Sequence, residues 1–305
     1  MGYEYPRGPV LGTDLRRHIP RSAVDKNYRQ LWPGMHLRRD VRPTFAVRTR
    51  AVAVQYPDAV LVGWSAALLW HHPWIPRGAV PHVASAMARR SLPGRRHTRL
   101  VPAEKRIREV DGMRVADPVA TAAELCRTAS FVEASIALDG LERVQPGTRE
   151  ELAECVEEFP RARFIRRVIA SVDAASPTRE VSWLRAQLVQ AGIDGFRPGE
   201  QIRLSPPGGS QIVWSPLLLH RALRAVIVEG PAPRVPGWRV ISVPPGYVRC
   251  EAAAIVARVD EVLSSASRHP RRATGAGGAM VGKDPHLAPA LGGRATTLEA
   301  SFWLG

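Results

Sequence analysis

Cysteine and long apolar runs are scarce in this sequence. The three cysteines, Cys126, Cys155 and Cys250, lie far apart and form no CxxC pair. This argues against a disulfide framework or a cysteine zinc site and favours a reducing compartment. The longest apolar stretches, AVLVGWSAALLW and SPLLLHRALRAVIV, fall short of the ~20 residues that cross a bilayer, and the N-terminal segment lacks an apolar signal-peptide core. We therefore expect a cytoplasmic protein without a membrane partner.

Acidic residues are also in short supply. The 305 residues include 28 Asp and Glu against 43 Lys and Arg, which gives a net charge of +15. Such a balance favours a polyanionic partner, with nucleic acid ahead of an anionic membrane surface. The alternative is surplus basic charge that meets no partner. Length and hydrophobic content are those of a globular chain with about two domains at roughly 150 residues each.

Residues 8–43 show the pattern of a compact basic module. VLGTDLRRH fits a short helix, Pro20 breaks it, and Ser22 is placed to cap a second helix, SAVDKNYRQL. Pro33-Gly34 then predicts a turn, and MHLRRDV fits a returning strand. Helix, turn, helix and hairpin in this order predict a winged helix-turn-helix.

The basic side chains of this module are the candidate contacts to DNA. Lys26 and Arg29 are three residues apart, which predicts that they share one helical face. We expect the second helix in the major groove, with Arg38 and Arg39 on the wing. The alternative is a solvated basic surface. The full candidate set is Arg16, Arg17, Arg21, Ser22, Lys26, Arg29, Arg38 and Arg39.

The rest of the chain divides by pattern into three segments. Residues 44–172 predict a middle α+β domain, in which Thr148 and Glu151 have the spacing of a capping box. Residues 173–265 predict an α/β unit with a helix starting near Glu180 and a strand ending at Glu229. Residues 266–305 are rich in glycine, alanine and proline without sustained periodicity, and we expect disorder there.

Several of these segments carry a family resemblance. GTDLRRHIPRSAVDKNYRQLWPGMHLRRDVRPT, VGWSAALLWHHPW and EVDGMRVADPVATAAELCR, together with SPTREVSWLRAQLVQAG and GWRVISV, resemble a large actinobacterial family. Its members join an AbiEi-type antitoxin-like winged helix (type IV toxin–antitoxin) to a domain similar to very-short-patch-repair endonucleases. The resemblance covers residues 10 to 265. It implies a restriction-endonuclease-like fold at the C-terminus, DNA as a partner and a cognate toxin protein as a further one.

The same resemblance implies metal-binding carboxylates, and here the sequence departs from the family. Glu180 matches the helix glutamate with an offset of one residue, and Glu229 matches the strand glutamate. The central aspartate position falls near Leu218, and the acidic position after Glu229 is Pro231. Aspartate is in fact absent between Asp194 and Asp260. Because Mg²⁺ catalysis needs several converging carboxylates, Glu180 and Glu229 are expected to be vestigial.

These observations favour a non-catalytic DNA-binding protein of the antitoxin-like regulator type, with a degenerate nuclease domain and no cofactor. Two alternatives stay open. One is a DNA endonuclease with rearranged ligands, in which Glu180, Glu229 and Glu200 would hold Mg²⁺. The other is an antitoxin that acts by protein contact with its toxin.

Overall fold

The chain folds as a mixed α+β protein, as its sequence predicts. The computed structural model describes residues 6–87, 93–204, 212–231 and 235–265, all within the unit Met1–Ser267. The disorder expected for residues 266–305 lies outside these residues. Across the described ranges, no helix has both the length and the apolar character needed to cross a membrane.

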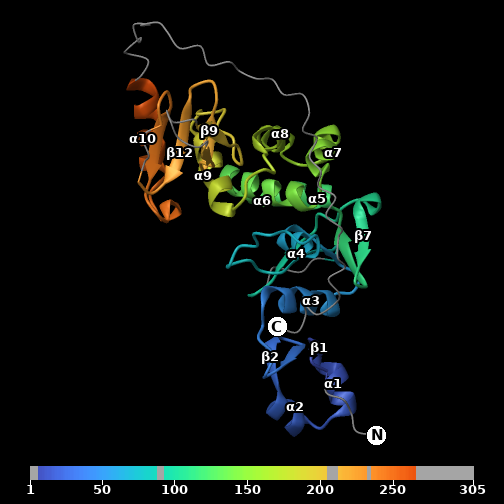
Figure 1. Ribbon diagram of the computed structural model, residues 1–305. Helices are drawn as coiled ribbons and strands as arrows, with labels where there is room; N and C mark the ends of the chain where they lie inside the picture. The colour runs from blue at the N-terminus through green and yellow to red at the C-terminus, as the bar shows by residue number, and fades with distance from the viewer. Residues whose placement is uncertain (1–5, 88–92, 205–211, 232–234, 266–305) are drawn as a thin grey trace, which may run out of the picture. The chain divides into compact units, whose positions relative to one another are not determined.

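Two short helices and a three-stranded sheet form the N-terminal part (Figure 1). The helices are α1 (Gly12–His18) and α2 (Arg21–Asn27). The strands β1 (Val10–Leu11), β2 (Tyr28–Trp32) and β3 (Met35–Arg38) lie in the order β1-β3-β2. The β2–β3 hairpin turns at Gly34, whose φ of +84° favours glycine. The predicted order of helix, turn, helix and hairpin is present.

The second helix is shorter than the sequence suggested. It ends at Asn27, because Tyr28 is buried and pairs with Arg38 across the hairpin, and this tertiary contact overrides local helix propensity. Arg29 therefore lies on β2, and the prediction that it shares a helical face with Lys26 was wrong. The predicted cap was also wrong, because the helix begins directly after Pro20 and Ser22 lies inside it.

A five-stranded sheet forms the centre of the next part. Its order is β6-β5-β4-β8-β7, with β4 (Val60–Leu61), β5 (His82–Ala84), β6 (Arg96–Thr98), β7 (Ile107–Val110) and β8 (Met113–Ala116). Helices α3 (Phe45–Gln55) and α4 (Gly63–Leu69) pack with it into one core, which also takes in Trp32 and Met35 of the hairpin. The Trp32 indole donates to Gln55 Oε1 at 2.6 Å. The hairpin is thereby attached to α3.

Four helices follow and share a second core. They are α5 (Pro118–Thr128), α6 (Phe131–Val144), α7 (Thr148–Glu154) and α8 (Ala162–Ser171), with a short 3₁₀ turn at Val156–Glu158 between α7 and α8. Another 3₁₀ turn, Glu104–Arg106, comes directly before β7. The capping box predicted at Thr148 is wrong. Gly147, with a φ of +90°, takes the N-cap position of α7, and the Thr148 hydroxyl donates instead to Gln145 O. The capping box lies at Ser130 and Glu133 of α6.

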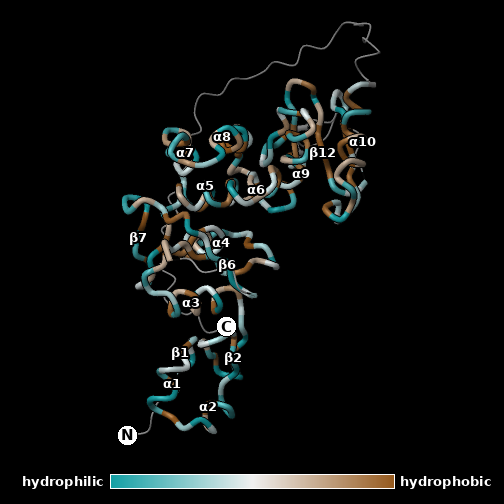
Figure 2. Tube along the Cα trace, turned by 180° about the vertical axis from the view of Figure 1, so that it is seen from behind, coloured by the Kyte–Doolittle hydropathy of each residue, from teal (hydrophilic) through white to brown (hydrophobic). Residues whose placement is uncertain are grey.

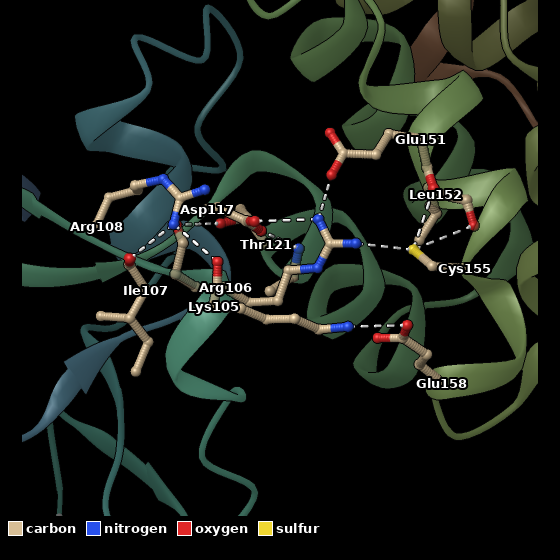
Figure 3. A network of polar contacts seen from close by, with 12 residues as sticks. Lys105, Arg106, Ile107, Arg108, Asp117, Thr121, Glu151, Leu152, Cys155 and Glu158 are labelled. Atoms are coloured by element: carbon tan, nitrogen blue, oxygen red, sulfur yellow. Dashed lines mark hydrogen bonds and ion pairs between the residues drawn. The ribbon is translucent and has the colours of Figure 1, made fainter.

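Arg106 connects the sheet to these helices (Figure 3). Its guanidinium donates to Asp117 Oδ2 at 3.2 Å, to Glu151, and to the Cys155 sulfur at 3.2 Å. Asp117 also caps α5 by accepting the Ala120 N–H at 2.8 Å. One side chain thus joins the approach to β7 with the start of α5 and with α7.

The C-terminal part combines helix α9 (Arg179–Gln190), helix α10 (Ala252–Ser265), a 3₁₀ turn at Tyr247–Arg249 and two small sheets. One sheet pairs β9 (Ile202–Leu204) with β10 (Ile212–Trp214). In the other, β12 (Ala225–Glu229) pairs antiparallel with β11 (Leu218–His220) and parallel with β13 (Arg239–Val243). β12 is strongly hydrophobic in Figure 2, in keeping with its buried position. Helix α9 packs against α6, where Arg185 and Asp139 form a buried ion pair with an N–O distance of 2.6 Å.

Candidate nucleic-acid interface

A basic hollow lies where α2 ends and β3 ends. Its volume is about 490 Å³, and it is lined by Lys26, Asn27, Arg38, Arg39 and Asp40. Three of these five side chains are cationic. Arg39 donates to the Asp25 carbonyl at 3.1 Å, which ties the end of β3 to α2. The fold therefore brings together basic residues from two elements that are separate in sequence.

The basic side chains around this hollow differ in whether a carboxylate binds them. Lys26 is exposed and makes no ion pair within the described part of the chain. Arg38 is half-buried and binds Asp40 with two hydrogen bonds, of 3.0 and 2.7 Å. A bidentate pair of this kind holds its arginine firmly. Lys26 and Arg39 are thus the cations of the hollow best placed to meet an anion.

The predicted contacts on α1 and at the start of α2 are all exposed. Arg16 has no carboxylate partner among residues 6–87, 93–204, 212–231 and 235–265. Arg17 pairs with Asp14 at 3.3 Å, and Arg21 pairs with Asp25 at 3.8 Å. Surface pairs of this type contribute about 0–1 kcal/mol, so they hold the two arginines only weakly. Ser22 is exposed as well, on the same helix.

Arg29 has a different environment from the other candidates. It is half-buried on β2, and its guanidinium donates to the carbonyl of Val41. This bond holds the chain that leaves the hairpin. The sequence pattern predicted a longer second helix and therefore placed Arg29 among the exposed cations. It gave no sign of Asn27 and Asp40, which line the hollow.

His36 on β3 packs against the start of α1, a contact that no sequence motif marks. A Cβ on Gly12 would lie only 2.7 Å from the His36 ring, so a side chain at this position would displace the histidine. Burial and the nearby Arg16 lower the pKa of His36. His36 is therefore a neutral packing residue beneath the exposed Arg16.

Glu180 and Glu229 approach the same tyrosine in the C-terminal part. Burial raises the pKa of Tyr247, and the charges of Glu229 and Glu180 raise it further. Glu229 ends β12 and accepts the backbone N–H of Gly246 at 2.8 Å, while Glu180 lies in the first turn of α9. Both matched glutamates therefore act electrostatically on the same buried tyrosine.

The remaining positions of the family's metal site hold no acid here. Leu218, at the expected aspartate position, is fully buried in β11 and pairs with Ile227. Glu200 forms an ion pair with Arg221 at 2.7 Å. Among the described residues, no three or more His, Cys, Asp or Glu side chains gather as a metal site would require. Within the described ranges, Glu180 and Glu229 are therefore not part of a cluster of three or more such ligands.

Comparisons with known proteins add little to this picture. No protein-family model matches the chain, and no curated protein does. Among solved structures, the chain is similar to the crystal structure of the Rv2827c protein from Mycobacterium tuberculosis. The two share 14% sequence identity with a TM-score of 0.38, and the alignment covers 83% of this chain and 90% of that one.

Proposed function

We propose that this protein is a non-catalytic DNA-binding protein of the antitoxin-like regulator type. One observation carries the proposal: Lys26 and Arg39 line the same hollow, beside two short helices and a hairpin. In a winged helix, the second helix enters the major groove and the hairpin contacts the backbone. Here the exposed cations of α1 and α2 and the one at the end of β3 would contact phosphates.

The overall charge supports the same partner. A chain with a net charge of +15 attracts a polyanion over long range and speeds its encounter. Phosphate contacts of this kind fix position without reading sequence. The six exposed candidates are the residues we assign to DNA: Arg16, Arg17, Arg21, Ser22, Lys26 and Arg39. The two half-buried candidates, Arg29 and Arg38, are assigned to holding the module together.

Charge reversal at the hollow tests the proposal. We expect Lys26→Glu/Arg39→Glu to weaken binding of the full chain to duplex DNA at least about tenfold, measured by fluorescence anisotropy at fixed salt. The matched control is Arg163→Glu/Arg258→Glu, which changes the net charge equally at exposed residues of α8 and α10. An equal loss in both variants would mean that only overall charge matters, and unchanged binding in the first would remove the proposed site.

The endonuclease alternative has one observation in its favour, namely that the charges of Glu180 and Glu229 both act on Tyr247. Plasmid incubated with the protein and Mg²⁺ or Mn²⁺ tests it. Cleavage that disappears in Glu229→Gln would establish a catalytic site and overturn the non-catalytic assignment. Because Leu218 supplies no ligand, we expect the plasmid to stay intact with both metals.

A further inference from the structure

A cleft of about 280 Å³ opens on the middle part of the chain, remote in sequence from the basic hollow. Residues from α4, the segment after it, β5, β6, α5, α6 and the first turn of α9 line it. The residues that decide its character are Trp64, Trp74, His82, Arg96, Glu133 and Arg179. The size suits a compact small molecule, since clefts for drug-sized ligands begin at about 300 Å³.

The two tryptophans of this cleft are held by a buried histidine. The His72 ring makes edge contacts with Trp64 and Trp74, at centroid distances of 5.2 and 6.2 Å. Its Nδ1 accepts the Trp74 backbone N–H at 3.1 Å, which leaves Nε2 to donate to Ala137 O at 2.9 Å. Both nitrogens are used, so one tautomer and one ring orientation are fixed. The apolar walls are therefore formed in advance of any ligand.

Helix α6 comes close to this histidine because of a glycine. A Cβ on Gly140 would lie 2.5 Å from His72 Nε2 and 3.1 Å from Trp74 Cε3. Any side chain there would push the ring and the tryptophan wall outward. Gly140 thus allows the tight packing that sets the position of Trp74.

The cleft also carries unneutralised positive charge. Among the residues that the structure describes, no carboxylate lies within ion-pair distance of Arg96 or Arg179. The acid of the cleft, Glu133, is occupied by its own helix start, where Oε2 accepts from the Ser130 N–H at 3.3 Å and hydroxyl at 3.1 Å. Arg96 and Arg179 thus line the cleft without a carboxylate partner in the described part of the chain, while the charge of Glu133 is held at the start of α6 by the Ser130 N–H and hydroxyl.

The floor of the cleft adds no charge of its own. His82 is buried, its backbone N–H donates to Ser65 Oγ at 2.8 Å, and its Nδ1 lies 3.7 Å from Glu124. Burial, with the charges of Arg96, Arg127 and His97, lowers the pKa of His82 to about 3, so the ring is neutral. Glu124 in turn accepts two hydrogen bonds of 2.7 Å from Arg127. The negative charge of Glu124 is therefore neutralised by Arg127.

We propose that this cleft binds a small organic anion, of the class of single- or double-ring aromatic carboxylates. The apolar body would contact Trp64 and Trp74, and the carboxylate would lie between Arg96 and Arg179. Guanidinium groups bind carboxylates with charge-assisted and often paired hydrogen bonds. This site goes beyond the proposed DNA binding, and its test uses no DNA, so each proposal can fail without the other.

Ligand-observed saturation-transfer NMR and calorimetry on the full chain test the site. The probes are benzoate and indole-3-carboxylate, their neutral amides, and inorganic phosphate. We expect the two carboxylates to bind at least about tenfold more tightly than their amides, because the amides lose the charge-assisted contacts. The indole N–H signals of Trp64 and Trp74 should shift on binding, while that of Trp238 should not.

Matched variants locate the charged end of the ligand. Arg96→Gln/Arg179→Gln should weaken carboxylate binding at least about tenfold, whereas Arg163→Gln/Arg258→Gln, with the same net charge, should stay within about twofold. Four results would overturn the assignment: no saturation transfer from either carboxylate at millimolar concentration, amides that bind as tightly as the acids, phosphate that competes as strongly as the ring carboxylates, or equal affinity in the two double variants.

Discussion

Leu218 pairs with Ile227 across β11 and β12, and both side chains are completely buried. This pair occupies the place where the family resemblance puts a metal-binding aspartate. Leu218 and Ile227 belong to the hydrophobic core shared with Leu184 and Ile241. A carboxylate there would meet apolar side chains, so the packing of the sheet does not accommodate an acid at this position.

Leu218→Asp should therefore destabilise the protein without creating a metal site. We expect a loss of at least about 4 kcal/mol in the free energy of unfolding, from the lost apolar contacts and the cost of a buried carboxyl group. Urea unfolding with and without Mg²⁺ measures it, and Leu218→Met, which conserves volume, should cost less than about 1.5 kcal/mol. Restoration of wild-type stability by Mg²⁺ would show that the metal site is latent rather than lost.

The N-terminal module shows how far sequence patterns reach. Pro20 and Pro33-Gly34 mark its breaks, because proline and glycine act through local backbone geometry. The end of α2 was not predictable in this way, since Tyr28 leaves the helix to pair with Arg38 in the hairpin. For the same reason Arg29 was expected on the second helix and lies on β2 instead. Exposed charge could be predicted from composition, but which arginine is free depends on partners such as Val41, supplied by the fold.

The C-terminal part shows the same contrast between local features, which the sequence predicts, and contacts that only the fold supplies. The helix expected to start near Glu180 is α9, and the strand expected to end at Glu229 is β12. The shared electrostatic effect of these two glutamates on Tyr247, a residue that no motif marks, depends on the tertiary structure. His72 illustrates the limit most clearly. It follows α4 as an ordinary polar residue in sequence, yet its ring is buried between Trp64 and Trp74.

His72 should make the protein less stable in mild acid. Burial lowers its pKa from 6.5 to about 4, so the folded state binds fewer protons than the unfolded state between these values. The free energy of unfolding should therefore fall as the pH drops through this window, by about 1.4 kcal/mol per pH unit for this histidine. Below about pH 4 its contribution is fully lost.

Urea unfolding at several pH values checks this, with His72→Gln as the comparison. Because glutamine does not titrate, the free energy of unfolding of the His72→Gln variant should depend less steeply on pH. Between pH 6 and 4.5 its slope should be smaller than that of the wild type by about 1.4 kcal/mol per pH unit. His82, whose pKa is lowered to about 3, adds the same trend to both proteins and cancels in the comparison. Parallel curves for the two proteins would mean that His72 is protonated without strain in the folded state.

The buried ion pair of Asp139 and Arg185 should be strongly coupled. Asp139 also accepts the Asp173 backbone N–H at 2.7 Å and the Ser182 hydroxyl, so its charge is satisfied from several sides although burial raises its pKa. Removing one partner leaves the other charge buried alone, which costs about 3–5 kcal/mol. Asp139→Leu and Arg185→Leu should each show such a loss in urea unfolding, while the double variant should lose clearly less than their sum. Additive losses would show that the pair contributes no coupling between α6 and α9.

Salt dependence should separate the exposed cations of the N-terminal module from the held ones. For DNA binding, each phosphate contact contributes about −0.9 to the slope of log affinity against log salt, so the five exposed arginines and lysines predict a slope of roughly −4 to −5. Lys26→Gln should reduce the size of this slope by about one, because its ammonium is exposed and unpaired within the described residues. Arg29→Gln should leave the slope unchanged and lower thermal stability instead, since its guanidinium binds Val41 O. Anisotropy titrations at four salt concentrations measure both slopes. A reduced slope in Arg29→Gln with unchanged stability would return Arg29 to the DNA-contacting set and contradict its assignment to the hairpin.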